Sequence, residues 1–235
     1  MAVKKKTMKV VFSLALLLLP LASAAEVKFD FMYLVQQWAP SFCATPPHEC
    51  QYEPRPPPND FTIHGLWPSS GERWPEYCNS SDTLDPKQIE DLERPLNQTW
   101  PSLPLNETNL ELWSNEWSKH GTCSKLGQHG YFAAALALDK LTNLRKILAD
   151  GGVVPVPPGV RKTYTFGEIS DALAKGTGLR TYLRCSQKTA GETLLYEVLQ
   201  CVDRSGERLI NCTAPFDHRC VNADKIEMPI ELYDQ

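Results

Sequence analysis

The sequence predicts a single α+β domain in which an antiparallel β-sheet packs against several α-helices and disulfides staple the fold. Segments rich in β-branched and aromatic residues lie near both ends of the chain, and helical patterns lie between them. Eight cysteines are spread over residues 43–220. No internal repeat or long linker divides the 235 residues, so we expect one domain over residues 26–235.

The first two strands are expected before residue 70. Residues 27–38 are rich in aromatic and β-branched side chains, which favours a strand. Apolar and polar residues alternate over 61–64, which predicts a short strand with His64 on the face opposite the apolar pair. Gly65 and Pro68 are expected to end this strand.

Helical patterns fill the middle of the chain. Proline in the first turn favours a helix start at Asp85-Pro86. Glycines favour helix ends at Gly121 and at Gly151-Gly152, and the longest helix carries apolar residues three and four positions apart. The expected helices run from Asp85 towards Trp100 and over residues 109–120, 131–148 and 166–175.

A β-hairpin is predicted near the C-terminus. Residues 194–202 and 208–212 have strand patterns, and the polar, glycine-containing segment 203–207 joins them. Cys201 and Cys212 would lie across this hairpin, near enough to form a disulfide.

Residues 1–25 have the pattern of a secretory signal peptide. Four lysines precede an apolar run from Val10 to Leu21, and Ala22-Ser23-Ala24 offers a cleavage site. The run is too short to span a bilayer comfortably, and no later stretch is long and apolar enough to do so. We therefore expect a protein of the secretory pathway, extracellular or vacuolar, without a membrane anchor.

An even number of cysteines in a secreted chain predicts a disulfide framework. The sequence contains no CxxC and no HxxxH pattern, so we expect no metal and no cofactor. Asn79, Asn97 and Asn106 begin glycosylation sequons, whereas a fourth sequon at Asn211 contains a cysteine that is expected to be bonded. Because no coiled coil or long edge strand is indicated, a monomer is expected.

The charge balance limits how the protein could hold nucleic acid. The chain has 24 Lys and Arg against 28 Asp and Glu, and removal of the four leader lysines would leave 20 against 28, a formal charge of −8. A protein this acidic does not bind nucleic acid through a general positive field. An RNA substrate would be contacted locally and briefly, and better at mildly acidic pH, where histidines are charged.

Two short segments carry the candidate chemistry. Residues 61–68 and 113–123 each hold one histidine between aromatic residues and glycine. On an α-helix, Glu116, Lys119 and His120 would share one face. Two imidazoles and a cation suffice for metal-free cleavage of RNA through its own 2′-hydroxyl, because one imidazole accepts a proton, the other donates one, and the cation stabilises the phosphorane.

Each feature also has a simpler interpretation. The second segment could be a surface helix with one Glu–Lys pair and two core tryptophans, His64 a locally bonded histidine, and Trp67 a core residue. The presence of two such segments in one chain favours the catalytic interpretation.

The two segments resemble the active-site signatures of the ribonuclease T2 family, secreted acid ribonucleases that include plant S-like and S-locus enzymes. The similarity extends to residues 29–38, Trp100-Pro101, residues 129–132 and the spacing of the last four cysteines. It implies an endoribonuclease that cleaves single-stranded RNA to 2′,3′-cyclic phosphate and then 3′-phosphate ends without a metal. An S-locus role in self-recognition is less favoured, because those enzymes tend to be basic.

The resemblance also implies roles for individual residues. His64 and His120 would be the acid–base pair, with Glu116 and Lys119 assisting at the phosphate. Which histidine is the acid stays open, and we take His64 as the proton donor. The implied substrate-binding residues are Gln37, Trp67, Leu112, Trp113 and Asn115, with Trp67 stacking on a base. The implied disulfides are Cys43–Cys50, Cys78–Cys123, Cys185–Cys220 and Cys201–Cys212.

Two departures from the family pattern stand out. Asn115 replaces a histidine that usually precedes the glutamate, and an asparagine can donate a hydrogen bond to a phosphate but carries no charge. We therefore expect weaker substrate binding, and a catalytically weakened storage or defence glycoprotein is the alternative function. A second departure is the loss of both halves of one disulfide, at Gln51 and in residues 102–105.

Overall fold

The computed structural model describes residues 28–51, 58–71, 74–188, 191–213, 216, 220 and 224–231. The predicted signal peptide and its cleavage site therefore lie outside the described residues. Among the described residues, no helix combines the length and the apolar character that a membrane span requires.

The structure confirms the α+β class. The strands are β1 (Phe31–Trp38), β2 (Phe61–Ser69), β3 (Tyr182–Gln187), β4 (Thr193–Val202), β5 (Leu209–Ile210) and β6 (Ile226–Glu227). The helices are α1 (Ala39–Cys43), 3₁₀-helix η1 (Pro86–Leu92), α2 (Glu93–Thr99), α3 (Asn109–Glu116), π-helix η2 (Trp117–Gly121), α4 (Thr122–Ser124), α5 (Gly127–Asp139), α6 (Leu144–Asp150) and α7 (Phe166–Thr177).

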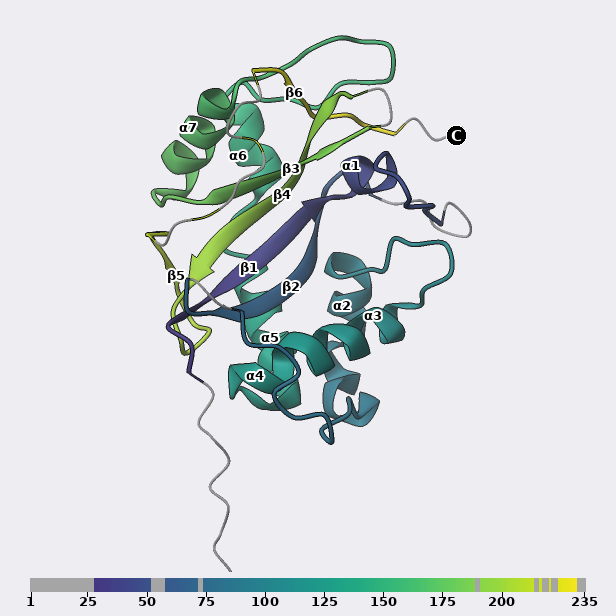
Figure 1. Cartoon of the computed structure of the whole chain (residues 1–235), viewed down its shortest axis with the longest axis vertical. Coiled ribbons are helices and arrows are strands. Elements are labelled where there is room, and N and C mark those ends of the chain that lie inside the picture. The colour runs from purple at the N-terminus through teal and green to yellow at the C-terminus, as the bar shows by residue number, and fades with distance from the viewer. Residues whose placement is uncertain are drawn as a thin grey trace, which may run out of the picture.

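The sheet runs in the order β2-β1-β4-β3, with all neighbours antiparallel. Strand β5 extends β4 as the predicted hairpin, and the short β6 pairs with β4 in parallel. Helices α2 to α5 gather on the side of β1 and β2, whereas α6 and α7 lie near β3 and β4 (Figure 1). Strand β3 was not indicated by the sequence pattern, and it supplies one residue of the candidate active site.

The prediction of a single helix over residues 131–148 is wrong, because the structure has two helices there, α5 and α6. Phe132 and Leu138 on α5 pack in the core cluster beneath β1 and β2. Leu144 and Leu148 on α6 pack in a second cluster with α7 and β4. A straight helix would direct one apolar stripe into one core, so the chain turns between Asp139 and Leu144. Leu141 lies in this turn and is 61% exposed.

The prediction that Gly65 and Pro68 end the second strand is also wrong. Strand β2 continues to Ser69, and its pairing with β1 shifts by one residue, since Val35 faces Gly65 and Gln36 faces Ile63. His64 is thereby the extra residue of a β-bulge. Bulges redirect a side chain without ending the strand, and they are frequent beside active sites.

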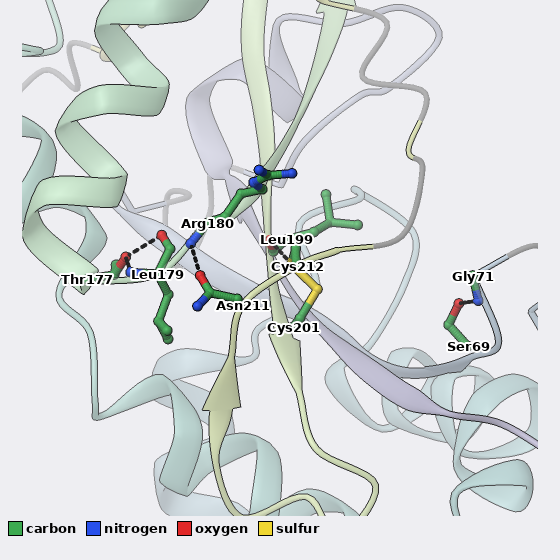
Figure 2. Close-up of a disulfide and its surroundings, with 9 residues drawn as sticks. All are labelled: Ser69, Gly71, Thr177, Leu179, Arg180, Leu199, Cys201, Asn211 and Cys212. Atoms are coloured by element: carbon green, nitrogen blue, oxygen red, sulfur yellow. Dashed lines mark hydrogen bonds between the residues drawn. A yellow bond between two sulfur atoms is a disulfide. The ribbon is translucent and has the colours of Figure 1, made fainter.

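The eight cysteines form the four expected disulfides, Cys43–Cys50, Cys78–Cys123, Cys185–Cys220 and Cys201–Cys212. Figure 2 shows Cys201 on β4 joined to Cys212, which lies beyond the end of β5. Next to this disulfide, the Asn211 side chain accepts a hydrogen bond of 2.9 Å from the Arg180 backbone.

The two segments that lack a family disulfide still lie side by side. Cys50 and Pro104 form an isolated antiparallel bridge. Backbone hydrogen bonds flank it, from Gln51 N to the carbonyl of Leu103 at 3.0 Å and from Leu105 N to the carbonyl of Glu49 at 2.8 Å. Backbone hydrogen bonds thus hold these two segments together in place of the missing disulfide.

A half-buried carboxylate lies at the corner between α5 and α6. Asp139 accepts a 2.9 Å hydrogen bond from Gln36, which in turn accepts a 2.7 Å bond from Gln200. Burial, aided by the charge of Asp60, raises the pKa of Asp139 to about 6. The folded protein therefore binds the proton of Asp139 more tightly than the unfolded chain does.

This preference gives a prediction for stability. In the unfolded chain, Asp139 titrates near a pKa of about 3.9, so its ionisation costs the folded state about 3 kcal/mol at pH 7 and little below pH 4. We expect Asp139→Asn to stabilise the protein at pH 7 by about this amount and to have little effect at pH 4. Urea unfolding at both pH values measures the difference.

The matched control is Asp171→Asn on α7, where the carboxylate is exposed. This variant should match the parent protein at both pH values. An equal effect of Asp139→Asn at pH 4 and pH 7 would contradict the assignment of a raised pKa.

Candidate active site

The bulge in β2 places His64 next to Glu116, the last residue of α3. Its backbone carbonyl accepts a 2.9 Å hydrogen bond from Trp100 Nε1, which fixes the bulge from the helical side. The imidazole is 30% exposed. The ring therefore reaches solvent on one side while its backbone is held by the core.

Gly65 permits the close approach of α3 to β2. A Cβ atom at this position would collide with Glu116 Oε2 and with Trp67 Nε1. Those two atoms form a hydrogen bond of 2.8 Å with each other. Glycine is required here because a side chain would occupy the space of that hydrogen bond.

The helix predicted over residues 109–120 starts where expected but changes form. Thr108 and Glu111 form a capping box at its N-terminus. After Glu116 the chain continues as the π-helix η2, then as α4, and it ends at Lys125 with φ 66°. The expected end at Gly121 is therefore wrong. Gly121 instead accommodates the Trp117 ring, with which a Cβ would collide.

The π-helix brings the second histidine to the first. An extra residue in the turn rotates the side chains after it about the helix axis, and π-turns are frequent at functional sites. His120 stacks on the Trp67 ring with centroids 5.0 Å apart, and the His64 ring lies 4.9 Å from Trp67 on an edge. Glu116 Oε1 lies 3.9 Å from His64 Nε2. The two sequence segments thus meet around one tryptophan.

Lys119 lies on η2 directly before His120. Its ammonium group lies 3.3 Å from Glu76 Oε1, and both side chains are partly exposed. The Lys119 carbonyl accepts a 2.9 Å hydrogen bond from Tyr77 N, and the adjacent Cys78–Cys123 disulfide fixes the loop to α4. Tyr77 has φ 52°, a left-handed conformation that is uncommon for tyrosine.

Sequence reasoning missed two residues of the site. Glu197 on β4 is 1% exposed, and its Oε1 lies 2.6 Å from His64 Nδ1. Arg184 on β3 binds the other carboxylate oxygen at 2.9 Å. The available signal was a glutamate inside a largely apolar strand.

The surroundings hold His64 in its charged form. Burial lowers the pKa of His64, but the hydrogen bond to Glu197 and the negative charges of Glu197 and Glu116 outweigh burial and raise the pKa above its ordinary value. Burial raises the pKa of Glu197, yet its contacts with His64 and Arg184 outweigh that effect and hold the pKa below the usual range. The pair is therefore ionised on both sides.

The surroundings of His120 have the opposite effect. Burial, then the positive charges of Lys119 and His64, lower the pKa of His120 to about 3. Burial also raises the pKa of Glu116, which the neighbouring positive charges and the Trp67 hydrogen bond oppose only in part. The buried Nδ1 of His120 has no hydrogen-bond partner among the described residues. The surroundings thus move the pKa values of the two imidazoles apart, and between these values His64 is charged while His120 is neutral.

The expected substrate-binding residues occupy different surroundings. Trp113 lies in the main core, 4% exposed, and donates a 2.8 Å hydrogen bond to the Trp100 carbonyl, so its position does not favour substrate contact. Trp67 is 5% exposed, which leaves little of its ring for stacking on a base. Gln37 is also buried, and Leu112 is partly buried against the main core.

Asn115 is the exposed member of that set. Its Nδ2 lies 3.5 Å from Glu107 Oε1, and the other oxygen of Glu107 accepts a 2.6 Å hydrogen bond from Ser102. An acidic group therefore neighbours the position where the family usually has a histidine.

Within the part of the chain that the structure describes, no group of three or more His, Cys, Asp or Glu side chains has an arrangement suited to a metal ion. The nearby carboxylates have other partners: Glu197 contacts His64 and Arg184, Glu116 accepts from Trp67, and Glu76 pairs with Lys119.

Comparisons with known proteins identify the family. The model of the Ribonuclease T2 family matches residues 29–212. Intracellular ribonuclease LX of Solanum lycopersicum is 37% identical over 228 residues, covering 96% of this chain and 93% of that protein. Extracellular ribonuclease LE of the same species is 36% identical over 211 residues, covering 86% and 90%.

A solved structure supports the same relationship. The crystal structure of RNase NT in complex with 5′-AMP superposes with a TM-score of 0.77 at 38% identity, covering 86% of this chain and 98% of that one. The chain therefore belongs to the Ribonuclease T2 family, is of the plant type, and is an endoribonuclease.

Proposed function

We propose that the protein is a secreted, metal-independent endoribonuclease that cleaves single-stranded RNA through attack of the ribose 2′-hydroxyl on the adjacent phosphate. The observation that supports this most strongly is that the His64 and His120 rings both contact Trp67, at 4.9 and 5.0 Å, in surroundings that raise the pKa of His64 and lower that of His120. Acid–base catalysis needs one proton donor and one acceptor at the same pH, and environments that separate two pKa values supply both.

In the first step, neutral His120 accepts the proton of the 2′-hydroxyl as its oxygen attacks phosphorus. The bond from phosphorus to the 5′-oxygen breaks, and charged His64 donates a proton from Nε2 to that leaving oxygen. The products are a 2′,3′-cyclic phosphate and a free 5′-hydroxyl. The assignment of His64 as donor rests on its raised pKa and the lowered pKa of His120.

In the second step the roles reverse. A water molecule gives a proton to His64 and attacks phosphorus, and His120, charged after the first step, protonates the 2′-oxygen. This opens the ring to a 3′-phosphate and restores both histidines to their starting forms. All protons are thus exchanged between the two imidazoles, the substrate and water.

Glu116 and Lys119 act at the phosphate. Lys119 exchanges its exposed partner Glu76 for a phosphate oxygen, which places positive charge where negative charge develops. Buried Glu116 lies 3.9 Å from His64 Nε2, the atom that carries the transferred proton, and its raised pKa is that of a group able to share a proton with the phosphate.

The proposed acidic pH preference has a different origin from the one that the sequence suggested. His120 need not be charged, because a base must be neutral and its pKa is about 3. Activity declines only when His64 loses its proton at higher pH. Activity should therefore be retained from pH 4 upward and decline on the alkaline side.

One observation favours a second candidate, a catalytically weakened storage or defence glycoprotein. Asn115 lies beside Glu107 rather than offering a positive charge to a phosphate. Both histidines and Lys119 are nevertheless in place, so we rank this candidate second.

We further propose passage through the secretory pathway and glycosylation at one or more sequons. Asn79 and Asn106 are exposed. Asn79 Oδ1 accepts hydrogen bonds from the backbone and hydroxyl of Ser81, the hydroxyl residue of its own sequon. One similar tomato protein is named extracellular and another intracellular, so both an extracellular and a vacuolar destination are compatible with the relatives.

The central prediction concerns cleavage of a defined RNA dinucleotide in EDTA at pH 5 and pH 7.5. We expect 2′,3′-cyclic phosphate as the first product, formed faster at pH 5. His64→Ala and His120→Ala should each lower the rate by about 100-fold or more, because each removes one proton-transfer group. Chromatography of the products measures this.

The control is His129→Ala, which removes an exposed histidine paired with Asp91 and should leave the rate unchanged. Absence of cyclic phosphate above the background of the two catalytic variants would favour the storage or defence candidate.

A further prediction concerns Asn115→His, which should raise kcat/KM at pH 5 by about fivefold through a charged hydrogen bond to the phosphate. Because Glu107 would partly neutralise the new imidazolium, the gain should be larger with Glu107→Gln in the same chain. Asn115→Gln keeps an amide and serves as the control. An unchanged or lower rate for Asn115→His at pH 5 would contradict the proposed phosphate contact.

A further inference from the structure

The proposed mechanism leaves a buried carboxylate and a half-buried guanidinium unexplained. Arg184 on β3 and Glu197 on β4 face each other directly in the sheet register. Neither belongs to the two segments that carry the catalytic residues. Burying a carboxylate is costly unless it is paired and hydrogen-bonded, and apolar residues would pack this part of the sheet at lower cost.

Glu197 uses both of its oxygens. Oε1 lies 2.6 Å from His64 Nδ1, and Oε2 accepts a 2.9 Å hydrogen bond from Arg184 Nη1. Since Nδ1 is held by this contact, Nε2 is the His64 nitrogen left on the side of Glu116, 3.9 Å from Oε1. A short hydrogen bond to a fixed carboxylate limits rotation of the imidazole and selects the form with a proton on Nδ1.

Arg184 is itself held in place. Its guanidinium carbon lies 5.6 Å from the Trp67 ring, 5.3 Å from Trp74 and 5.5 Å from Phe216. These are cation–π distances, and they position a positive charge behind Glu197. The chain of contacts therefore runs from three aromatic rings through Arg184 and Glu197 to His64.

We propose that Glu197 is a positioning residue for His64, held in place by Arg184, and that it orients the imidazole and keeps it charged for proton donation. The inference rests on the proposed function for the reaction that His64 serves. The contact between Glu197 and His64 does not depend on the proposed function.

Other titratable groups also face His64, and a test must leave them unchanged. They are Glu116 on α3, His120 on η2, and His48 after α1, in addition to Glu197 on β4 and Arg184 on β3. None of the three remaining groups changes when Glu197 or Arg184 is replaced, so a difference in titration reports on the pair.

The test is an NMR titration of the His64 imidazole in the parent protein, in Glu197→Gln and in Arg184→Gln, without substrate. Glu197→Gln removes the negative partner and should lower the pKa of His64. Arg184→Gln removes a positive charge that opposes protonation and should raise it. The two variants are therefore expected to move the titration in opposite directions, which a general loss of stability would not produce.

Dinucleotide cleavage supplies the second readout. Glu197→Gln should lower kcat by about 10- to 100-fold at pH 7, and less at pH 5, where a larger fraction of His64 is protonated. KM should change little, and the alkaline limb of the pH profile should move to lower pH. Glu192→Gln removes an exposed carboxylate next to β4 and is the matched control, expected to behave as the parent protein.

An unchanged His64 titration in Glu197→Gln, or a shift of both variants in the same direction, would overturn the inference. A parent protein that cleaves no RNA would contradict the proposed function alone, because the titration is measured without substrate.

Discussion

The close approach of α3 and η2 to strand β2 is the constraint on which the rest of the site depends. Gly65 permits it, since a Cβ at this position would collide with Glu116 and Trp67, whereas Gly121 leaves room for the Trp117 ring of its own helix. The Cys78–Cys123 disulfide and the hydrogen bond from Trp100 to the His64 carbonyl hold the two sides together. Residues far apart in the sequence thereby meet around Trp67, and backbone proximity sets the distances between their side chains.

Proximity alone would not separate the protonation states of two histidines. His64 has two carboxylates within reach, whereas His120 is buried against Trp67 with Lys119 and His64 as its charged neighbours. Low polarity strengthens each of these interactions, so the same fold raises one pKa and lowers the other. An acidic protein can therefore present a cationic group at a single point without a general positive field.

Much of the fold is encoded in local sequence. Asp85-Pro86 starts helical structure, the Thr165–Glu168 capping box starts α7, and the C-terminal hairpin forms around the expected disulfide. The exceptions have tertiary causes. The pattern over 131–148 is periodic throughout, yet the chain turns because its two halves serve different cores.

The sequence by itself determined the α+β class, the disulfide partners through the family resemblance, and the two segments that meet around Trp67. Only the tertiary structure decided the bulge at His64, the π-turn before His120 and the burial of Trp113, because strand register and helix form depend on what packs against them. It also decided that Glu197 and Arg184 join the site. Their strands lie far along the chain from β2, and no local pattern records a contact made across a sheet.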